Sequence, residues 1–355
     1  MILPEVKYLS NNFDGIKNQK FGVEIECTGL TRAMAAKTIA KVLRSDSGYD
    51  GGFYDKYIVK DSENRRWNIV YDSSIKRVNR NGQSTDSEKY AVEIVTPVLE
   101  YKDIELLQEV VRAVRKAGGV TGADYNCGIH IHINGSPYDA QSVRNLVNIF
   151  ASKENFLFDV LQVAHKRERY CQKVDRNFLE KINNKKNISM DDIKNYWYNG
   201  NTEDVRRHYS STRYRALNLH SLFADGHWEM RACNSSLHAG VLRSYIVLAL
   251  AISNAALTRK YCSPKVSESD NLRYSCRVWL INLGLNGEEF KNCRKHLISH
   301  LDGCISWRHP EDAIAQRERL KQQNRKPKNY ESEQDNGQAQ NSVGQEENSG
   351  MNMSM

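Results

Sequence analysis

The chain has 355 residues, of which 40% are hydrophobic and 26% are charged, and its formal net charge is +8. This composition excludes a chain that is disordered throughout, and the length allows one large domain or two smaller ones with a full core. Residues 326–355 contain two lysines and five acidic residues, a net charge of −3, so the other residues carry +11. Such an excess suits an anionic ligand: a nucleotide, an acidic peptide or a nucleic acid.

The N-terminal stretch MILPEVKYLSNN turns polar within a few residues, unlike a secretory signal peptide. No uninterrupted apolar stretch approaches the ~18 residues that a transmembrane helix needs. We therefore expect a soluble, cytoplasmic protein without a membrane partner.

Eight cysteines are scattered along the chain without a Cys-x-x-Cys pair, which is typical of reduced, partly buried thiols. The segment CRKHLISHLDGC superficially resembles a zinc signature, with Cys293, His296, His300 and Cys304 as candidate ligands. In a continuous helix the two cysteines would lie roughly 16 Å apart along the axis, too far for one tetrahedral ion. We interpret the segment as an amphipathic helix, with partial ligation after a break at Gly303 as the alternative.

Apolar residues repeat at intervals of three and four in several segments, which predicts helices over 31–43, 102–119, 141–163 and 240–257. The last of these is apolar enough to be buried. Between the helices lie short segments in which apolar residues alternate with polar ones, so the pattern is that of an α+β or α/β protein. The Gly- and Tyr-rich stretch 45–61 predicts a loop or a pair of strands at the edge of the sheet.

Five short segments each predict a strand with one apolar and one polar face, because side chains alternate along a strand. In FGVEIEC, residues 21–27, Glu24 and Glu26 share one face, roughly 7 Å apart at the backbone. The polar face of WNIVYDSS carries Asp72, and that of AVEIVTP carries Glu93. The polar face of CGIHIHIN carries His130 and His132, and that of HWEMRAC carries His227, Glu229 and Arg231.

Each of these side chains has a structural explanation when it is considered alone. The glutamates fit a solvated strand, His130 and His132 fit a satisfied interior pair, and Glu229 with Arg231 fits an ion pair. Together, however, crowded carboxylates raise one another's pKa unless a cation compensates. Carboxylate oxygens suit magnesium or manganese, ions that commonly share a site with substrate phosphates. We therefore predict bound Mg²⁺ or Mn²⁺.

In this order FGVEIE, DSS, EIVTP, CGIHIH and WEMR resemble the amidoligase family, carboxylate-amine ligases related to glutamine synthetase and glutamate-cysteine ligase. The similarity extends from about residue 20 to residue 255. It implies an α+β fold with a curved, mainly antiparallel sheet, the half-barrel of glutamine synthetase, which holds ATP and magnesium on its concave face and packs helices on its convex face. It also implies that ATP phosphorylates a carboxylate and that an amine then displaces phosphate, leaving an amide or isopeptide bond.

The resemblance further implies roles for particular residues. Glu24, Glu26, Glu93 and Glu229 look like metal ligands, and His130 and His132 fall where the family contacts the nucleotide phosphates or a metal. Arg231 resembles the arginine that steadies the transferring phosphoryl group, so Arg231, Glu24 and Glu229 form the expected catalytic set. Independently of the resemblance, the basic stretches HKRERYCQKV and RYRALNL offer Arg213 and Arg215, with Arg167 and Arg169, as candidate clamps for phosphate or carboxylate, and a solvated basic surface is their alternative. A role for Asp72 stays open.

On this interpretation residues 1–19 are an N-terminal lead and 20–260 are the catalytic domain. Residues 261–325 are a helical extension and 326–355 a disordered tail. Within the domain, the basic excursion at about 164–215 would cover the site and shield an acyl phosphate from water.

Two other classes of function remain open. A metal-dependent hydrolase would use His130 and His132 with a transition metal, but four glutamates suit hard ions better. A nucleic-acid-binding or interaction protein would explain the positive charge but not the glutamates, which repel phosphate in the absence of metal. We expect ATP and unidentified carboxylate and amine substrates, such as amino acids, peptides or cell-wall-related molecules, and no nucleic acid.

Overall fold

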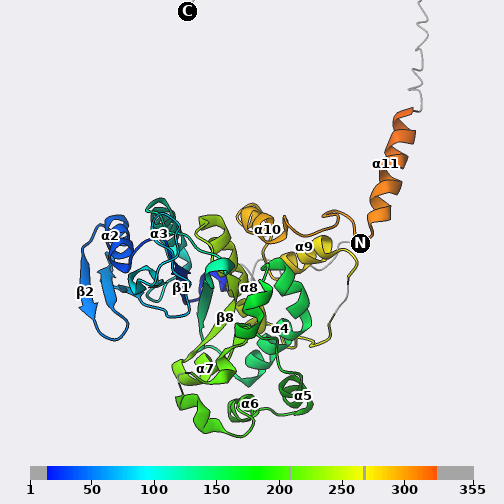
Figure 1. Ribbon diagram of the computed structural model, residues 1–355. Coiled ribbons are helices and arrows are strands. Elements are labelled where there is room, and N and C mark those ends of the chain that lie inside the picture. The colour runs from blue at the N-terminus through cyan, green and yellow to red at the C-terminus, as the bar shows by residue number, and fades with distance from the viewer. Residues whose placement is uncertain (1–13, 208, 267–268, 326–355) are drawn as a thin grey trace, which may run out of the picture. The chain divides into compact units, whose positions relative to one another are not determined.

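A computed structural model describes residues 14–207, 209–266 and 269–325, and the elements below belong to these residues (Figure 1). Their eight strands form one sheet in the order β2-β3-β4-β5-β1-β6-β8-β7, and all neighbouring pairs are antiparallel. The strands are β1 (Phe21–Cys27), β2 (Ser47–Gly51), β3 (Lys56–Lys60), β4 (Arg66–Val70), β5 (Val92–Val95), β6 (Gly128–Asn134), β7 (Leu217–Asn218) and β8 (His227–Asn234). The sheet and its helices confirm the predicted α+β class.

Four helices confirm the predicted helical segments to within three residues at each end. They are α2 (Arg32–Leu43), α3 (Ile104–Lys116), α4 (Ala140–Val160) and α8 (Ala239–Thr258). The remaining helices are α5 (Arg176–Asn184), α6 (Met190–Trp197), α7 (His220–Asp225), α9 (Leu272–Asn282), α10 (Lys291–Ile298) and α11 (Pro310–Arg325). Helix α2 begins where it does because the Thr31 side chain accepts a hydrogen bond from the Met34 amide, which satisfies a free donor of the first turn.

The apolar face of the sheet packs against the helices. Val23 and Ile25 of β1 and Ile129 and Ile131 of β6 are at most 1% exposed and share one hydrophobic cluster with residues of α2, α3, α4 and α8. Because side chains alternate along a strand, this packing leaves the opposite face of the same strands for the charged residues. The stretch 45–61 forms the strand pair β2–β3, which confirms the second of the two predicted alternatives and places β2 at the edge of the sheet.

Among the described residues, α8 is the one helix that is long and apolar enough to cross a membrane. Within its most apolar window, however, 78% of the residues are buried inside the protein, as expected of a core helix. Helix α8 packs against α3, α4 and α10, which confirms the prediction of a buried helix.

The CRKHLISHLDGC segment is helical only in its first part, because α10 ends at Ile298. Its residues have separate surroundings: Cys293 is buried, the His296 ring packs against the His238 ring at 5.0 Å between centroids, and His300 hydrogen-bonds the Asp159 carbonyl at 3.0 Å. None of the groups of described residues that could hold a metal ion includes these side chains.

The chain forms two compact units, residues 1–310 and residues 311–355, and nearly all of α11 lies in the second. The predicted tail, 326–355, lies outside the described residues, as does most of the predicted lead, 1–19. The boundary expected near residue 260 stays a prediction.

Gly29, just after β1, is the point where the chain approaches the loop that follows α3. It has a φ of +83°, and a Cβ there would lie 2.6 Å from the Gly118 carbonyl oxygen. Thr28 and Val120 exchange both backbone hydrogen bonds beside it, at 2.8 and 2.9 Å. Moving the two segments apart to make room for a side chain would therefore break these hydrogen bonds. Only glycine therefore fits at this end of the central strand.

We expect Gly29→Ala to lower the free energy of unfolding by about 2–4 kcal/mol, from the left-handed backbone and the backbone clash together. Gly52→Ala is the matched control, because Gly52 has a φ of +76° with nothing within 4 Å of the added Cβ. It should cost only the backbone term, about 1–2 kcal/mol. Urea denaturation measures both, and equal losses would contradict the close approach at Gly29.

Candidate functional site

The register of the sheet brings the predicted site residues together. On β1, Glu24 lies opposite His130 of β6, and Glu26 lies opposite Glu93 of β5. His132 of β6 lies opposite Glu229 of β8. All belong to the face of the sheet opposite the one that packs against α2, α3, α4 and α8, so four strands contribute charged groups to one site.

A bulge in β8 adjusts this site. The pairing of β6 with β8 shifts between Ile129 and Ile131, which face Cys233 and Met230, so β8 has one residue more than its partner here. The extra residue falls beside Arg231, and bulges commonly re-aim a side chain next to an active site. The alternation of apolar and polar residues along HWEMRAC did not reveal it.

His130 lies at the centre of the cluster and is only 6% exposed. Its Nδ1 lies 2.9 Å from Glu24 Oε2 and 3.4 Å from Glu229 Oε1, whereas its Nε2 lies 3.7 Å from Glu26 Oε1. Two groups could hold a metal ion, Glu24 with His130 and Glu229, and Glu26 with Glu93 and His130. In each group one ligand atom per residue lies within 4.8 Å of the others.

Glu26 and Glu93 need a compensating charge. Burial raises the pKa of the Glu26 carboxyl, and the nearby Asp72 raises it further. Burial also raises the pKa of Glu93 well above its usual value, and repulsion from Glu24, Glu26 and Asp72 adds to the shift. The Gly128 amide donates to Glu26 Oε2 at 2.6 Å but carries no full charge. Carboxylates with one imidazole form a donor set that fits a hard divalent cation.

Glu24 differs from Glu26 and Glu93 in the direction of its pKa shift, because His130 and His132 both contact its carboxylate. Burial alone would raise the pKa of its carboxyl, but the charges of His132 and His130 and their hydrogen bonds hold that pKa well below its usual value. The same contact raises the pKa of His132, although burial works in the opposite direction.

Arg231 and Asn218 hold Glu229 from two sides. Arg231 Nη1 donates to Glu229 Oε1 and Asn218 Nδ2 donates to Glu229 Oε2, both at 2.6 Å. Burial would raise the pKa of Glu229, but the guanidinium of Arg231 lowers it to about 2. Arg231 Nε is buried and has no hydrogen-bond partner among the described residues. A buried donor of this kind fits an anionic oxygen.

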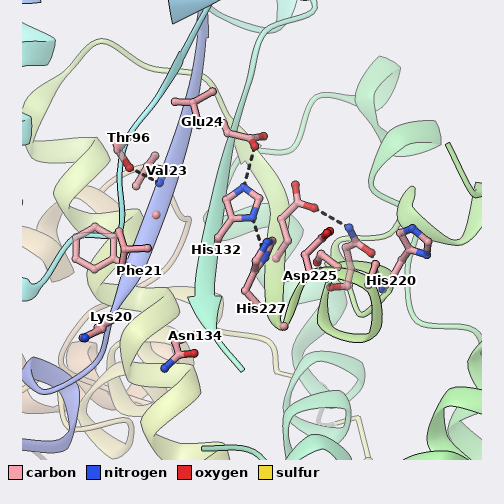
Figure 2. A pocket seen from close by; sticks show the side chains of 18 of the residues that line it. Lys20, Phe21, Val23, Glu24, Thr96, His132, Asn134, His220, Asp225 and His227 are labelled. Atoms are coloured by element: carbon pink, nitrogen blue, oxygen red, sulfur yellow. Dashed lines mark hydrogen bonds and ion pairs between the residues drawn. The ribbon is translucent and has the colours of Figure 1, made fainter. Parts of the chain in front are cut away.

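A cavity of about 990 Å³ adjoins this cluster and has Glu24, His132 and Glu229 in its lining. Figure 2 shows His132 between Glu24 and His227, with Lys20 and Asn134 toward the end of the view away from Glu24. His132 Nε2 lies 3.3 Å from Glu24 Oε1, and its Nδ1 lies 3.1 Å from His227 Nδ1. The cavity therefore leads from the surface to the charged cluster.

The four candidate arginines have different surroundings. Arg213 lines the cavity, whereas Arg215 is not among its lining residues. Arg167 is buried, and its guanidinium donates to the backbone carbonyls of Cys233 and Arg231. These hydrogen bonds hold the C-terminal half of β8 in place. Arg169 is exposed and lies 4.6 Å from the ring centroid of its neighbour Tyr170.

Asn218 is a site residue that sequence analysis missed. It lies in β7, opposite Glu229, and its side chain is 2% exposed. The only signal was a polar residue within the apolar run RALNL, which does not reveal its partner.

A family model described as putative amidoligase enzyme matches residues 17–253, about two thirds of the chain. The four strands that build the charged face, β1, β5, β6 and β8, fall inside this range. The chain therefore belongs to the amidoligase family, whose name denotes ligases that form amide bonds. No curated protein matches the chain.

We expect Mg²⁺ to raise the melting temperature, because a divalent ion would relieve the repulsion between the crowded carboxylates. Glu93→Gln removes one of them, so this variant should melt higher than wild type without Mg²⁺ and respond less to it. Calorimetric melting with MgCl₂, against KCl at the same ionic strength, measures the effect. Glu105→Gln, on an exposed position of α3, is the control. An equal Mg²⁺ response in all three proteins would contradict a site at Glu93.

Arg215 anchors the base of the 164–215 excursion instead of facing the cavity. Its Nη1 donates to the Lys173 carbonyl at 2.7 Å, and its guanidinium lies 5.8 Å from the Trp197 ring centroid. Glu154 of α4 completes the anchor, because its Oε1 accepts the Val174 amide at 2.6 Å. A role for Arg215 in binding the cofactor stays a prediction.

This anchor should make stability depend on pH. Burial raises the pKa of Glu154 from 4.5 to about 7. The Glu154 carboxyl therefore holds its proton more tightly in the folded protein than in the unfolded chain. Stability is then lost as the pH rises between these two values. Glu154→Gln cannot ionise and should be more stable than wild type at pH 8 by about 1–3 kcal/mol, with a smaller gain at pH 5.

Urea denaturation at both pH values measures this difference, and Glu180→Gln, at an exposed position of α5, is the control. The same difference at pH 5 and pH 8 would contradict the assignment to ionisation of Glu154.

Proposed function

We propose that the chain is an ATP- and Mg²⁺-dependent carboxylate-amine ligase that works through an acyl phosphate, with Mn²⁺ as an alternative ion. One observation carries this proposal: two groups of potential metal ligands meet at His130, and Glu229 links His130 to Arg231, whose Nε has no hydrogen-bond partner among the described residues. Phosphoryl transfer depends on positioning and charge neutralisation, for which this arrangement of acids and a cation is suited.

The proposed reaction has two steps. A carboxylate oxygen of the first substrate attacks the γ-phosphorus of ATP, the bond to the β–γ bridging oxygen breaks, and ADP leaves. The nitrogen of the amine then attacks the carbonyl carbon of the acyl phosphate, inorganic phosphate leaves, and the amine loses a proton to solvent. The product is an amide or, where the amine belongs to a side chain, an isopeptide.

The acidic residues have the proposed role of metal ligands. Glu24 and Glu229 would hold one ion and Glu26 and Glu93 a second, with His130 between them. When bound, magnesium supplies the positive charge that the ATP phosphates and the crowded carboxylates both need. His132 contacts Glu24 and would keep its carboxylate oriented toward the first ion.

Arg231 has the proposed role of contacting the transferring phosphoryl group. Its Nη1 is engaged by Glu229, which fixes the direction of the guanidinium, while Nε keeps a donor for an oxygen that gains negative charge. A donor that is fixed in advance, in a site with little water, stabilises such charge at low reorganisation cost.

The cavity is the proposed site of the carboxylate and amine substrates. Its volume of about 990 Å³ is at the upper end of the 300–1,000 Å³ that is common for small-molecule sites. Arg213 and Lys20 are cations in its lining that suit a substrate carboxylate, and Asp225 is an anion that suits an ammonium group. Amino acids, peptides and cell-wall-related molecules all fit this description, and the expected cellular location is the cytoplasm.

The segment that covers the cavity has the proposed role of excluding water. Val205, Arg206 and Arg213 of the 164–215 excursion contribute to the lining. An acyl phosphate hydrolyses readily, so a cover over the site favours amide formation over loss of the intermediate.

We expect calorimetry to detect ATP binding in the presence of Mg²⁺ and none after chelation. Glu24→Ala should lose this binding, because it removes a ligand that contacts both histidines. Arg231→Ala should bind ATP but release ADP about 100-fold more slowly once a carboxylate and an amine are supplied. Glu105→Gln is again the control.

Folded wild-type protein that binds no nucleotide with either Mg²⁺ or Mn²⁺ would contradict the proposal. So would unchanged ADP release in both Glu24→Ala and Arg231→Ala.

A further inference from the structure

Exposed aromatic side chains gather at the turn between β2 and β3, outside the cavity lining. Phe53 is 89% exposed and Tyr54 is 45% exposed, and their rings meet edge to face at 5.3 Å between centroids. Scattered exposed aromatics are common, but neighbouring ones on a tight turn form a contiguous apolar surface, which typically marks a binding site.

The turn is held firmly even though its side chains are exposed. Arg32 is 3% exposed, its Nε donates to the Asp55 carbonyl at 3.2 Å, and its guanidinium also pairs with the Asp55 carboxylate. The same guanidinium donates to the Ala91 carbonyl at 2.8 Å, just before β5. One buried cation therefore ties the turn to the strand that carries Glu93. A surface fixed in this way loses little conformational entropy when a ligand binds.

A second segment joins the aromatic surface from the other side of the site. Tyr54 hydrogen-bonds Tyr209, which is 68% exposed and belongs to the 164–215 excursion. The Arg213 guanidinium lies 5.9 Å from the Tyr209 ring centroid. The Tyr71 amide donates to the Tyr54 carbonyl at 2.9 Å, and the preceding residue, Val70 of β4, lies opposite Glu93 of β5, so the cluster lies near the acidic face.

The position of this cluster distinguishes it from the cavity. The cavity lies around the N-terminal half of β1, with Gly22, Thr96 and Asn134 in its lining, and neither Phe53 nor Tyr54 contributes to it. The turn lies beyond β5, since β2, β3 and β4 follow β5 on one side of β1, whereas β6 and β8 lie on the other. Arg213 is the residue common to the two regions.

We propose that Phe53, Tyr54 and Tyr209 form the surface on which the base of ATP stacks. The proposal rests on the function proposed above and deepens it. An adenine ring is flat and uncharged, so it gains little from carboxylates or metal ions but stacks well on aromatic rings and on a guanidinium plane. The triphosphate then extends from the turn past Glu93 to Arg231, and the cavity stays free for the carboxylate and the amine.

The test compares ATP with inorganic triphosphate, which has the same phosphates but no base, by calorimetry in excess Mg²⁺. Phe53→Ala, Tyr54→Ala and Tyr209→Ala should each weaken ATP binding about 10-fold and leave triphosphate binding unchanged. Tyr54→Phe restores the ring without the hydroxyl and should restore ATP binding. Tyr261→Ala removes an aromatic side chain that is 62% exposed and lies beyond α8, and it controls for the loss of any exposed ring.

The outcomes separate this inference from the proposed function. Wild-type protein that binds neither ATP nor triphosphate would refute the ligase proposal itself. Wild-type protein that binds ATP, with alanine variants that bind it equally well, would overturn only the stacking surface. Equal losses for ATP and triphosphate would also overturn it, since the variants would then have disturbed the phosphate site. A raised KM for the amine or carboxylate with unchanged ATP binding would assign the surface to another substrate and overturn the proposal.

Discussion

Glu26 and Glu93 lie opposite each other on neighbouring strands, and both are raised in pKa by burial. Carboxylates in such a position destabilise the fold unless they stay protonated or meet a cation. The other features of the site follow from this constraint. Arg231 brings positive charge toward the acids, His130 places an imidazole between them, and Glu24 and Glu229 are open to the cavity that they line. The site thus stores electrostatic repulsion that a ligand can relieve.

The apolar face of the same strands contributes the free energy that keeps the crowded carboxylates in a folded protein. Val23 and Ile25 alternate with Glu24 and Glu26 on β1, and the apolar pair is at most 1% exposed beneath the helices. Burial of about 25 cal/mol per Å² of apolar surface on one side can offset the cost of crowded charge on the other. Hydrogen bonds between antiparallel strands also fix the separation of the acids, so the repulsion cannot relax by sliding. Packing and electrostatics are therefore coupled through single strands.

Alternation along short strands was enough to predict which residues share the charged face, because the period of two is a property of the backbone. It also predicted the helices, whose apolar periodicity is strong. It could not show the order of the strands, which depends on long-range pairing, and it missed the bulge beside Arg231, which breaks the alternation locally. Arginines in the excursion were the least predictable, since Arg213 and Arg215 are two residues apart yet only Arg213 lines the cavity. Their surroundings depend on how an irregular segment packs.

The position of His130 has a consequence for the order in which ions bind. Its Nδ1 faces Glu24 and Glu229, and its Nε2 faces Glu26, but a neutral imidazole offers a lone pair on only one nitrogen at a time. An ion on one side selects the tautomer and leaves an N–H pointing at the other side. The two sites would then fill unequally, the second through carboxylates alone. An ion held so weakly is well suited to arrive and leave together with the phosphates.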